Sequence, residues 1–485
     1  MEAAVAALDI SPPARLAVGK GTAFVVAGHC YHPRERTRAL AIQIGDLRQP
    51  VDRFRLPRQD VYDSLAEDDP ARPHAFRSGF VALLDLDQVD RLRSIELTAL
   101  LDFAGDLEVR APLGAIEVEP RTGSPADVAK ARFPDAAGPR VAICMATYNP
   151  PPELLRRQLD SMREQTHRNW VCLISDDNSD AEMLAALEAE VRGDPRFVLS
   201  HGRTRLGYYR NFERALSMAP AEADFVTLCD QDDLWHPAKL ERLLDAIGDA
   251  QLAYSDARLV SPAGELIAPS YWTERRNNYT NFGSLLLANS VTGAASLFRR
   301  ELLDDALPFP LELAKPFHDH WLAIVALARG EIAYLDEPLY DYVQHGGAVI
   351  GHSEANRRPR PIRQHIRERL RNPTGGSRAV YYYSWYQQLL FAEVLRLRCW
   401  EAMTPAKRRT LRRLLSADRT VTGLAWLLGR RARRLWGHDE TLDRELFYGS
   451  ALVRRRAVSL WTLGRRRPNR ILPRDESIPP TSDHR

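Results

Sequence analysis

The sequence contains few cysteines, and none of them is spaced for metal or redox chemistry. The five cysteines are far apart and include no C-x-x-C pair: Cys30, Cys144, Cys172, Cys229 and Cys399. An odd number at this spacing indicates neither a disulfide framework nor a zinc knuckle. Three of the five lie in apolar runs, so we expect them to be small core residues.

Long apolar segments and a strong charge imbalance are also absent. No window approaches the ~20 apolar residues that a membrane span requires. The N-terminus, where Glu2 and Asp9 bracket a short alanine-rich stretch, lacks the cationic and apolar regions of a secretory leader. The net charge is only +3, so the overall field does not favour nucleic acid as a partner. We therefore expect a cytoplasmic protein.

The sequence does contain enough apolar material for several folded domains. Of its 485 residues, 45% are hydrophobic and 27% are charged, which is the balance of a soluble globular protein. A domain usually has roughly 100–200 residues, so this length predicts two or three domains.

The residue pattern changes along the chain and indicates where these domains lie. In residues 1–119, short apolar runs alternate with turn and charge clusters, which predicts an accessory β-sandwich. Residues 120–140 contain four prolines among Gly, Ala and charged residues, and we expect a linker there.

Residues 141–353 alternate apolar runs with amphipathic stretches. Strands are expected at 141–145, 170–175 and 225–229, and helices at 153–165, 183–191 and 240–247. This alternation is typical of an α/β fold, with a mostly parallel sheet covered by helices on both faces. Ligands of such sheets bind beyond the carboxyl ends of the strands, so the polar residues that follow the strands are candidate site residues.

Residues 354–485 form an arginine-rich region that we expect to be helical. Apolar residues recur at helical spacing over 381–403 and 411–436, with tryptophans among the arginines. Two interpretations are open. The plainer one is a helical bundle with a solvated basic face. The other is peripheral contact with the inner membrane, where aromatic side chains lie at the interface and arginines meet lipid phosphates.

Three carboxylates lie within four residues directly after the expected strand at 225–229. The segment Asp230-Gln231-Asp232-Asp233 concentrates negative charges that repel one another unless a cation compensates them. Oxygen ligands at this density suit Mg²⁺ or Mn²⁺, which would also neutralise a diphosphate. Taken alone, an exposed acidic turn or a helix N-terminus explains the motif equally well.

Polar residues also follow the two preceding strands. Ala146-Thr147-Tyr148-Asn149 follows the first of them and Asp176-Asp177-Asn178-Ser179 follows the second. The carboxyl ends of parallel neighbouring strands meet at one crevice. Polar residues after three such strands are therefore better explained by a shared binding site than by separate helix caps. Tyr148 offers a ring face to a base, Asp177 could accept a hydrogen bond from a ribose hydroxyl or a base N–H, and Arg210 could meet phosphate or base.

From Val141 to His352 the residues resemble the family 2 glycosyltransferases, which have the GT-A fold. Within that family, the segment is most similar to bacterial rhamnosyltransferase-like proteins. The resemblance rests on an ordered set of motifs that spans some two-fifths of the chain: Ala146-Thr147-Tyr148-Asn149, Asp176-Asp177-Asn178-Ser179, Leu206-Gly207 through Arg210-Asn211, Asp230-Gln231-Asp232-Asp233-Leu234-Trp235, Val291-Thr292-Gly293-Ala294, His318-Asp319-His320-Trp321 and Tyr342-Val343-Gln344-His345-Gly346.

The resemblance implies a role for each matching position. The positions that would hold the nucleotide are Ala146, Thr147, Tyr148, Asn149, Asp177, Arg210 and Asp230. Asp230 and Asp232 fall on the D-x-D motif of the family, which binds Mn²⁺ or Mg²⁺ together with the diphosphate. His345 lies where related enzymes can add a metal-binding histidine, although a packed histidine explains it equally well. The positions that would face the sugar or the acceptor are Asp233, Gly293, His318, His320 and Trp321.

Asp319 falls on the catalytic base of the family. An acceptor hydroxyl that attacks an anomeric carbon needs a positioned carboxylate to take its proton, while the metal stabilises the departing diphosphate. The implied reaction is a single displacement with inversion. The structural alternative for Asp319 is the N-cap of a helix over 321–327.

The activity implied by the resemblance is transfer of a sugar from a UDP- or dTDP-sugar to a glycan or lipid-linked glycan acceptor, in surface polysaccharide synthesis. The similarity leans toward dTDP-rhamnose. Two departures concern one loop: Val343 stands where an arginine is common, and Gly347-Ala348 replace a stretch that commonly carries Asn.

Two other functions compete with this interpretation. A catalytically inactive glycan- or nucleotide-binding scaffold is the main alternative, and the joint presence of Asp230, Asp232 and Asp319 counts against it. A nucleotidyltransferase would need a glycine- and lysine-rich triphosphate loop, and we find none in the sequence.

Overall fold

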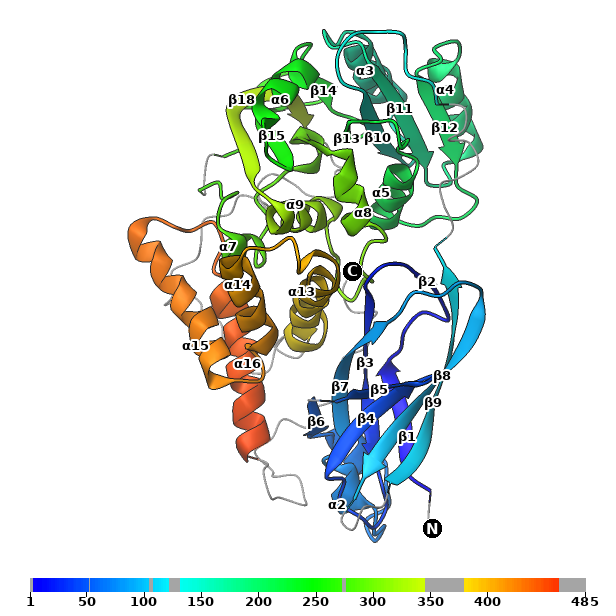
Figure 1. Ribbon diagram of the computed structural model, residues 1–485, viewed down its shortest axis with the longest axis vertical. Coiled ribbons are helices and arrows are strands. Elements are labelled where there is room, and N and C mark those ends of the chain that lie inside the picture. Colours follow the sequence, from blue (N-terminus) through cyan, green and yellow to red (C-terminus); the bar gives the residue numbers. More distant parts are fainter. Residues whose placement is uncertain are drawn as a thin grey trace.

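The chain folds into an N-terminal β part, a central α/β part and a C-terminal helical part (Figure 1). The computed structural model describes residues 3–51, 53–103, 108–121, 131–272, 276–344 and 379–461. The expected fold class of each of the three parts is confirmed.

The N-terminal part consists of two sheets that face each other across one core. The first sheet has the order β1 (Val5–Ile10), β3 (Thr22–Tyr31), β7 (Gly79–Leu86), β6 (Arg53–Leu56), and the second has the order β2 (Arg15–Val18), β9 (Glu108–Pro120), β8 (Arg93–Asp102), β4 (Ala39–Ile44), β5 (Leu47–Pro50). Phe24 and Phe80 from the first sheet share a buried cluster with Ile42, Leu97 and Val118 from the second. Two short helices that we did not expect, α1 (Gln59–Asp63) and α2 (Arg72–Ala75), lie between β6 and β7 in the chain.

The central part is built on one nine-stranded mixed sheet. Its order is β12 (Phe197–His201), β11 (Trp170–Asp176), β10 (Val141–Thr147), β13 (Phe225–Cys229), β17 (Ser296–Arg299), β15 (Leu252–Val260), β18 (Ile332–Val343), β14 (Leu234–Trp235), with β16 (Leu266–Ala268) paired to β15. The first four strands are parallel. Residues 141–145 of β10 are fully buried because helices cover both faces of the sheet.

The helices of the central part begin and end close to the expected positions. The three expected helices are α3 (Pro152–Arg163), α4 (Ala181–Val191) and α6 (Lys239–Ile247). The others are α5 (Tyr208–Ser217), α7 (Phe282–Leu285), η2 (Gly293–Ala295), η3 (Arg300–Leu302), α8 (Leu303–Ala306) and α9 (His318–Arg329). Because β11, β10 and β13 are parallel neighbours, the residues that follow them meet at one edge of the sheet.

The C-terminal part contains more helices than the apolar spacing indicated. They are η4 (Val380–Trp385), α13 (Tyr386–Cys399), α14 (Pro405–Ser416), α15 (Val421–Gly429), η5 (Arg430–Trp436) and α16 (Arg444–Trp461). The segment 411–436, where apolar residues recur at helical spacing, is not one continuous helix. A new helix starts after Thr420, whose side chain caps it by accepting a hydrogen bond from the Gly423 N–H. Among the described residues, no helix is both long enough and apolar enough to cross a membrane.

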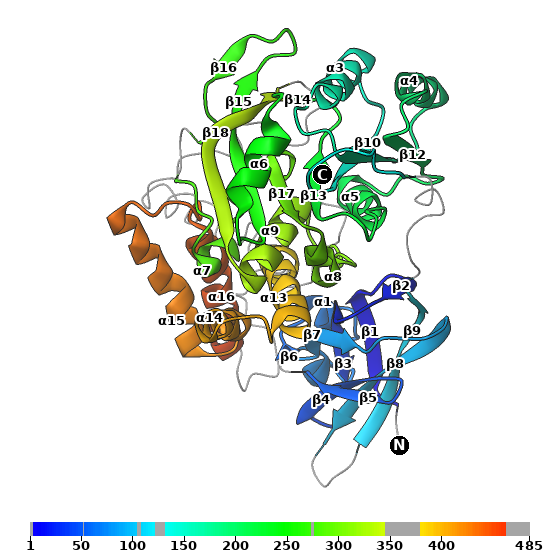
Figure 2. The same cartoon turned by 45° about the horizontal axis from the view of Figure 1, so that its top comes forward.

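The three parts are joined by buried polar contacts, and α13 lies between the other two (Figure 2). The Arg398 guanidinium on α13 donates to the carbonyl oxygens of Gly21, Asp305, Ala306 and Pro308. Helix α13 is therefore fixed both to the N-terminal part at Gly21 and to the segment of the central part that follows α8, and it also packs against α9.

Candidate active site

A cleft of about 1050 Å³ opens beyond the carboxyl ends of β10, β11 and β13. Its lining includes Ala146, Thr147, Tyr148 and Asp177 from the first two strand ends, Asp230 and Asp232 from the third, and Gly293, His318 and Asp319 from across the sheet. The strand ends that the sequence pointed to therefore border the same cavity.

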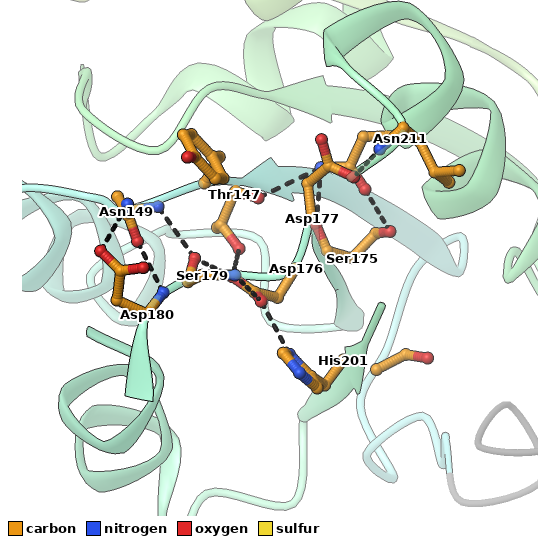
Figure 3. Close-up of polar contacts among 12 residues, drawn as sticks. Thr147, Asn149, Ser175, Asp176, Asp177, Ser179, Asp180, His201 and Asn211 are labelled. Carbon is orange, nitrogen blue, oxygen red and sulfur yellow. Dashed lines mark hydrogen bonds and ion pairs between the residues drawn. The ribbon is translucent and has the colours of Figure 1, made fainter. Parts of the chain in front are cut away.

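Two consecutive aspartates at the end of β11, Asp176 as its last residue and Asp177 directly after it, organise the backbone at one end of the cleft (Figure 3). The buried Asp176 carboxylate accepts hydrogen bonds from the Thr147 Oγ1 hydroxyl at 3.1 Å and the Ser179 N–H at 2.9 Å, and it pairs with His201 Nδ1 at 2.9 Å. The Asp177 carboxylate accepts from the N–H groups of Leu206 and Gly207 at 2.6 and 2.8 Å. Asp177 thus anchors the loop that leads into α5.

Tyr148 is positioned by a residue inside the acidic motif. The Tyr148 N–H donates to Gln231 Oε1 at 2.8 Å, and Gln231 Nε2 donates to the Tyr148 carbonyl oxygen at 3.3 Å. The guanidinium carbon of Arg205, which also lines the cleft, lies 3.9 Å from the centroid of the Tyr148 ring. An aromatic ring with a cation on its face is a suitable platform for a planar base.

The acidic residues after β13 are crowded. Burial raises the pKa of Asp230 to about 7, and the negative charges of Asp232 and Asp319 contribute to the same shift. Within the part of the chain that the structure describes, no group of three or more His, Cys, Asp or Glu side chains is arranged to hold a metal ion. Mg²⁺ is commonly held by one or two carboxylates together with substrate phosphates, so Asp230 and Asp232, which both line the cleft, fit a cation that arrives with a diphosphate.

Asp319 faces these carboxylates from the first turn of α9. Its Oδ1 accepts from the His320 N–H at 2.6 Å and its Oδ2 from the Gly293 N–H at 3.3 Å. Burial raises the pKa of Asp319 to about 6. Gly293 allows this close approach, because a Cβ there would lie only 3.0 Å from His318 Nε2 and 3.3 Å from Asp319 Cβ.

His318 closes the cleft beside Asp319. Its ring stacks on Phe212, with 3.8 Å between the ring centroids. Burial lowers the pKa of His318 to about 3, so the imidazole is neutral at physiological pH. A neutral ring packed in this way is suited to shape the cavity and does not add charge to it.

The sequence of the central part matches a known family. Residues 142–307 match the family described as Glycosyl transferase family 2. This segment is a family 2 glycosyltransferase domain. It contains β10 to β13 with the acidic motif, and it ends before Asp319.

Individual relatives of the family 2 domain cover different shares of the chain. The putative glycosyltransferase EpsH of Bacillus subtilis is 27% identical over 230 residues, which are 44% of this chain and 63% of EpsH. The succinoglycan biosynthesis protein ExoW of Rhizobium meliloti is 34% identical over 104 residues, which are 21% of this chain and 32% of ExoW. The chain thus spans less than two thirds of the length of either relative.

Among solved structures, S. aureus TarS 1-349 in complex with UDP-GlcNAc is similar to this chain. The two are 15% identical, and the match covers 66% of this chain and 92% of the TarS 1-349 chain with a TM-score of 0.36.

Several residues that the sequence pointed to lie outside the cleft of the family 2 domain. Asn149 joins two strand ends through its side-chain contacts with Asp180. Arg210 donates to the carboxylates of Glu213 and Glu312 and to the carbonyl oxygens of Phe309 and Pro310, so its guanidinium is turned to these acceptors and not to the cleft.

Three further candidates are packed into the protein. Asp233 is buried, and its Oδ1 accepts from the Val343 N–H at 3.3 Å. The His320 ring contacts the Leu285 carbonyl oxygen at 2.6 Å, and the buried Trp321 Nε1 donates to the Ala306 carbonyl oxygen at 2.8 Å. His345 lies outside the described residues.

Sequence reasoning missed two residues of the site. Gln231 lies inside the acidic motif, where the spacing predicts a role only for the carboxylates. Arg205 lies in a loop whose residues show no helical or strand periodicity. The one sequence signal near it is Gly207, two residues later, which indicates a tight turn. Gly207 has a φ of +81°, which a residue with a side chain rarely adopts, and this turn carries the loop toward Tyr148.

Proposed function

We propose that this chain is an inverting glycosyltransferase that moves a sugar from a nucleotide-diphosphate donor onto a glycan acceptor. The observation that carries the proposal is that Tyr148, Asp177, Asp230, Asp232 and Asp319 border one cleft in a chain that contains a family 2 domain. We assign this domain to the GT-A fold on the same grounds.

The nucleotide end of the proposed site is the part around Tyr148. The base stacks on the Tyr148 ring, and Arg205 takes the cationic role that the sequence suggested for Arg210. Each Asp177 oxygen accepts one backbone N–H and retains a second lone pair for a ribose hydroxyl or a base N–H. Ala146 and Thr147 border the same pocket.

The acidic pair Asp230 and Asp232 would hold Mn²⁺ or Mg²⁺ together with the donor diphosphate. Such a cation, when bound, neutralises the diphosphate and stabilises it as a leaving group. Burial raises the pKa of Asp230 to about 7 and the negative charges of Asp232 and Asp319 add to the shift, which supports this role because a divalent cation favours the ionised carboxylates.

Asp319 is the proposed general base. The acceptor hydroxyl oxygen forms a bond to the anomeric carbon while its proton passes to the Asp319 carboxylate. The bond from the anomeric carbon to the diphosphate oxygen breaks, and the nucleoside diphosphate leaves with the electron pair. Attack opposite the leaving group inverts the anomeric configuration. The N–H groups of Gly293 and His320 hold the carboxylate in place for this step.

The biological setting that we propose is surface polysaccharide synthesis in the cytoplasm, with a UDP- or dTDP-sugar donor such as dTDP-rhamnose. The name of ExoW, a succinoglycan biosynthesis protein, supports this setting. Peripheral contact with the inner membrane is part of the proposal, because Leu435 and Trp436 at the end of η5 are 80% and 71% exposed. Flotation with anionic vesicles tests it, and equal flotation of wild type and Trp436→Ser would count against it.

A donor panel tests the enzymatic proposal. UDP-, dTDP- and GDP-sugars are incubated with the full chain, with Mn²⁺ or with EDTA, and released nucleoside diphosphate is measured. We expect metal-dependent release from a UDP- or dTDP-sugar, and UDP or dTDP with Mn²⁺ should raise the melting temperature. Nucleotide binding without release from any donor would instead favour an inactive scaffold, and release of pyrophosphate would indicate a nucleotidyltransferase.

A further inference from the structure

The cleft continues past Asp319 into the C-terminal helices. Its far wall is lined by residues of η4, α13 and α16 and of the turn before α16, among them Gln388, Phe391, Leu442, Arg444 and Tyr448. All of these residues lie beyond the segment 142–307 that matches the family. The C-terminal helices therefore supply one end of the cavity as well as packing against the sheet.

The turn before α16 has an unusual backbone. Leu442 and Asp443 have φ values of +51° and +58°, in the left-handed region that residues other than glycine rarely adopt. The buried Asp443 carboxylate accepts from Arg431 Nε at 3.2 Å and from Arg434 Nη1 at 3.0 Å. Two ion pairs thus hold a strained turn, and the residues on either side of Asp443 line the cleft. Strain that is held in this way is typical of binding sites.

Arg444 is left without an acidic partner by this turn. Its guanidinium lies 5.2 Å from the centroid of the Phe447 ring, and the structure gives it no ion pair with any described carboxylate. Burial raises the pKa of the neighbouring Tyr448 phenol, and the positive charge of Arg444 opposes that shift. The guanidinium is thus close to the cleft wall and free to bind an anion.

Lys315 brings a second cation to the cleft. It is exposed and, like Arg444, makes no ion pair with a described carboxylate. The backbone just before it is fixed, because the N–H groups of Leu313 and Ala314 donate to Gln387 Oε1 of α13 at 2.7 and 3.2 Å. The cleft is therefore acidic at Asp230, Asp232 and Asp319, and Lys315 and Arg444 add two cations to its lining besides Arg205 at Tyr148.

We propose that the part of the cleft formed by the C-terminal helices is the acceptor site, and that Arg444 and Lys315 select an acceptor carrying an anionic group. This inference rests on the proposed function and adds the chemical class of the acceptor. The anion can be a carboxylate of an acidic glycan or a phosphate of a lipid-linked glycan, since a guanidinium binds both.

Binding of three probes to the full chain, with UDP and Mn²⁺ present, tests the inference. The probes are neutral maltotetraose, tetragalacturonic acid, which carries carboxylates, and citronellyl-diphosphate-linked glucose, which carries phosphates. Each is titrated by calorimetry against wild type, Arg444→Gln, Lys315→Gln and the control Arg409→Gln. Arg409 is an exposed arginine on α14 that does not line the cleft.

We expect at least one anionic probe to bind more tightly than maltotetraose. Arg444→Gln and Lys315→Gln should each weaken that binding about tenfold, as expected for loss of a charged hydrogen bond, and Arg409→Gln should leave it unchanged. Whichever anionic probe binds more tightly shows whether the site selects a carboxylate or a phosphate. The rise in melting temperature of each variant with UDP and Mn²⁺ shows whether the variant is folded and whether its donor end still binds nucleotide.

Three results would overturn the inference: equal binding of neutral and anionic probes, unchanged affinity in both Arg444→Gln and Lys315→Gln, or no binding of either anionic probe by wild type. Donor release with Mn²⁺ is measured on the same samples. Its absence would refute the proposed function, whereas donor release without anion selectivity would refute only this acceptor site.

Discussion

Replacing Asp319 with Asn should slow turnover by orders of magnitude and at the same time stabilise the protein. Asn retains the shape of the side chain, and its Oδ1 can still accept from the His320 N–H, but its Nδ2 cannot replace the Asp319 oxygen that accepts from the Gly293 N–H at 3.3 Å. It cannot take a proton from an acceptor hydroxyl. Loss of a general base typically slows a reaction by about 10² to 10⁴-fold, and we expect a loss of that size in kcat with donor binding retained.

The stabilisation follows from the cost of ionising Asp319 in the folded protein. Burial raises its pKa from 3.8 to about 6, which corresponds to about 3 kcal/mol at a pH where the carboxyl is ionised in both states. The cleft admits water and Asn loses the hydrogen bond from the Gly293 N–H, so the observed stabilisation should be about 1 kcal/mol. The pKa of Asp319 is higher in the folded protein than in the unfolded chain. The free energy of unfolding of wild type therefore falls as pH rises from about 4 to about 6, and the ionisation of Asp319 lowers it by a constant amount above pH 6.

Urea denaturation of wild type and Asp319→Asn, without metal or nucleotide, measures this effect at pH 4.5 and pH 8. We expect the variant to be more stable at pH 8, with a smaller difference at pH 4.5. Asp249→Asn is the matched control, since Asp249 lies on an exposed turn after α6 and does not line the cleft. Full turnover by Asp319→Asn would refute its role as base, and equal stability at pH 8 would refute the electrostatic reasoning.

Four further outcomes follow from the same geometry. The kcat/KM for transfer should fall as pH drops through about 6, because Asp319 must be ionised to act as a base; a profile flat down to pH 5 would contradict this. Arg205→Ala should weaken UDP binding about fivefold through loss of the cation at Tyr148, and calorimetry should find Arg203→Ala, in the same loop, unaffected. Asp232→Asn should reduce the stabilisation by UDP that depends on Mn²⁺, and a thermal shift equal to that of wild type would argue against the metal assignment. Asp443→Asn should lower the free energy of unfolding by about 1–3 kcal/mol because two arginines lose their partner, and unchanged urea stability would mean that these ion pairs do not hold the turn.

Much of the candidate site could be found from the sequence because its residues follow buried strands. A strand covered on both faces needs a continuous apolar run, as residues 141–145 have, and the polar residue that ends such a run marks the edge of the sheet. Tyr148, Asp177 and Asp230 were found in this way. Asp319 follows no strand, and its assignment depended on the family resemblance.

The residues that were missed or misplaced belong to contacts between distant segments. Whether Arg210 reaches a nucleotide depends on Glu312, which is 102 residues away in the chain and holds the guanidinium away from the cleft. The stacking of Arg205 on Tyr148 likewise joins two loops that no local spacing relates.

By itself, the amino-acid sequence determined the positions of β10, β11 and β13 and of the helices α3, α4 and α6, the fold class of each part and the position of the acidic motif. These features depend on periodicity and on the turn chemistry of neighbouring residues, which are local properties. The tertiary structure alone decided which arginine lies over the Tyr148 ring and which helices complete the cleft. Arg444 reaches the cavity because Asp443, held by Arg431 and Arg434, fixes a backbone turn that a residue with a side chain would not adopt unaided.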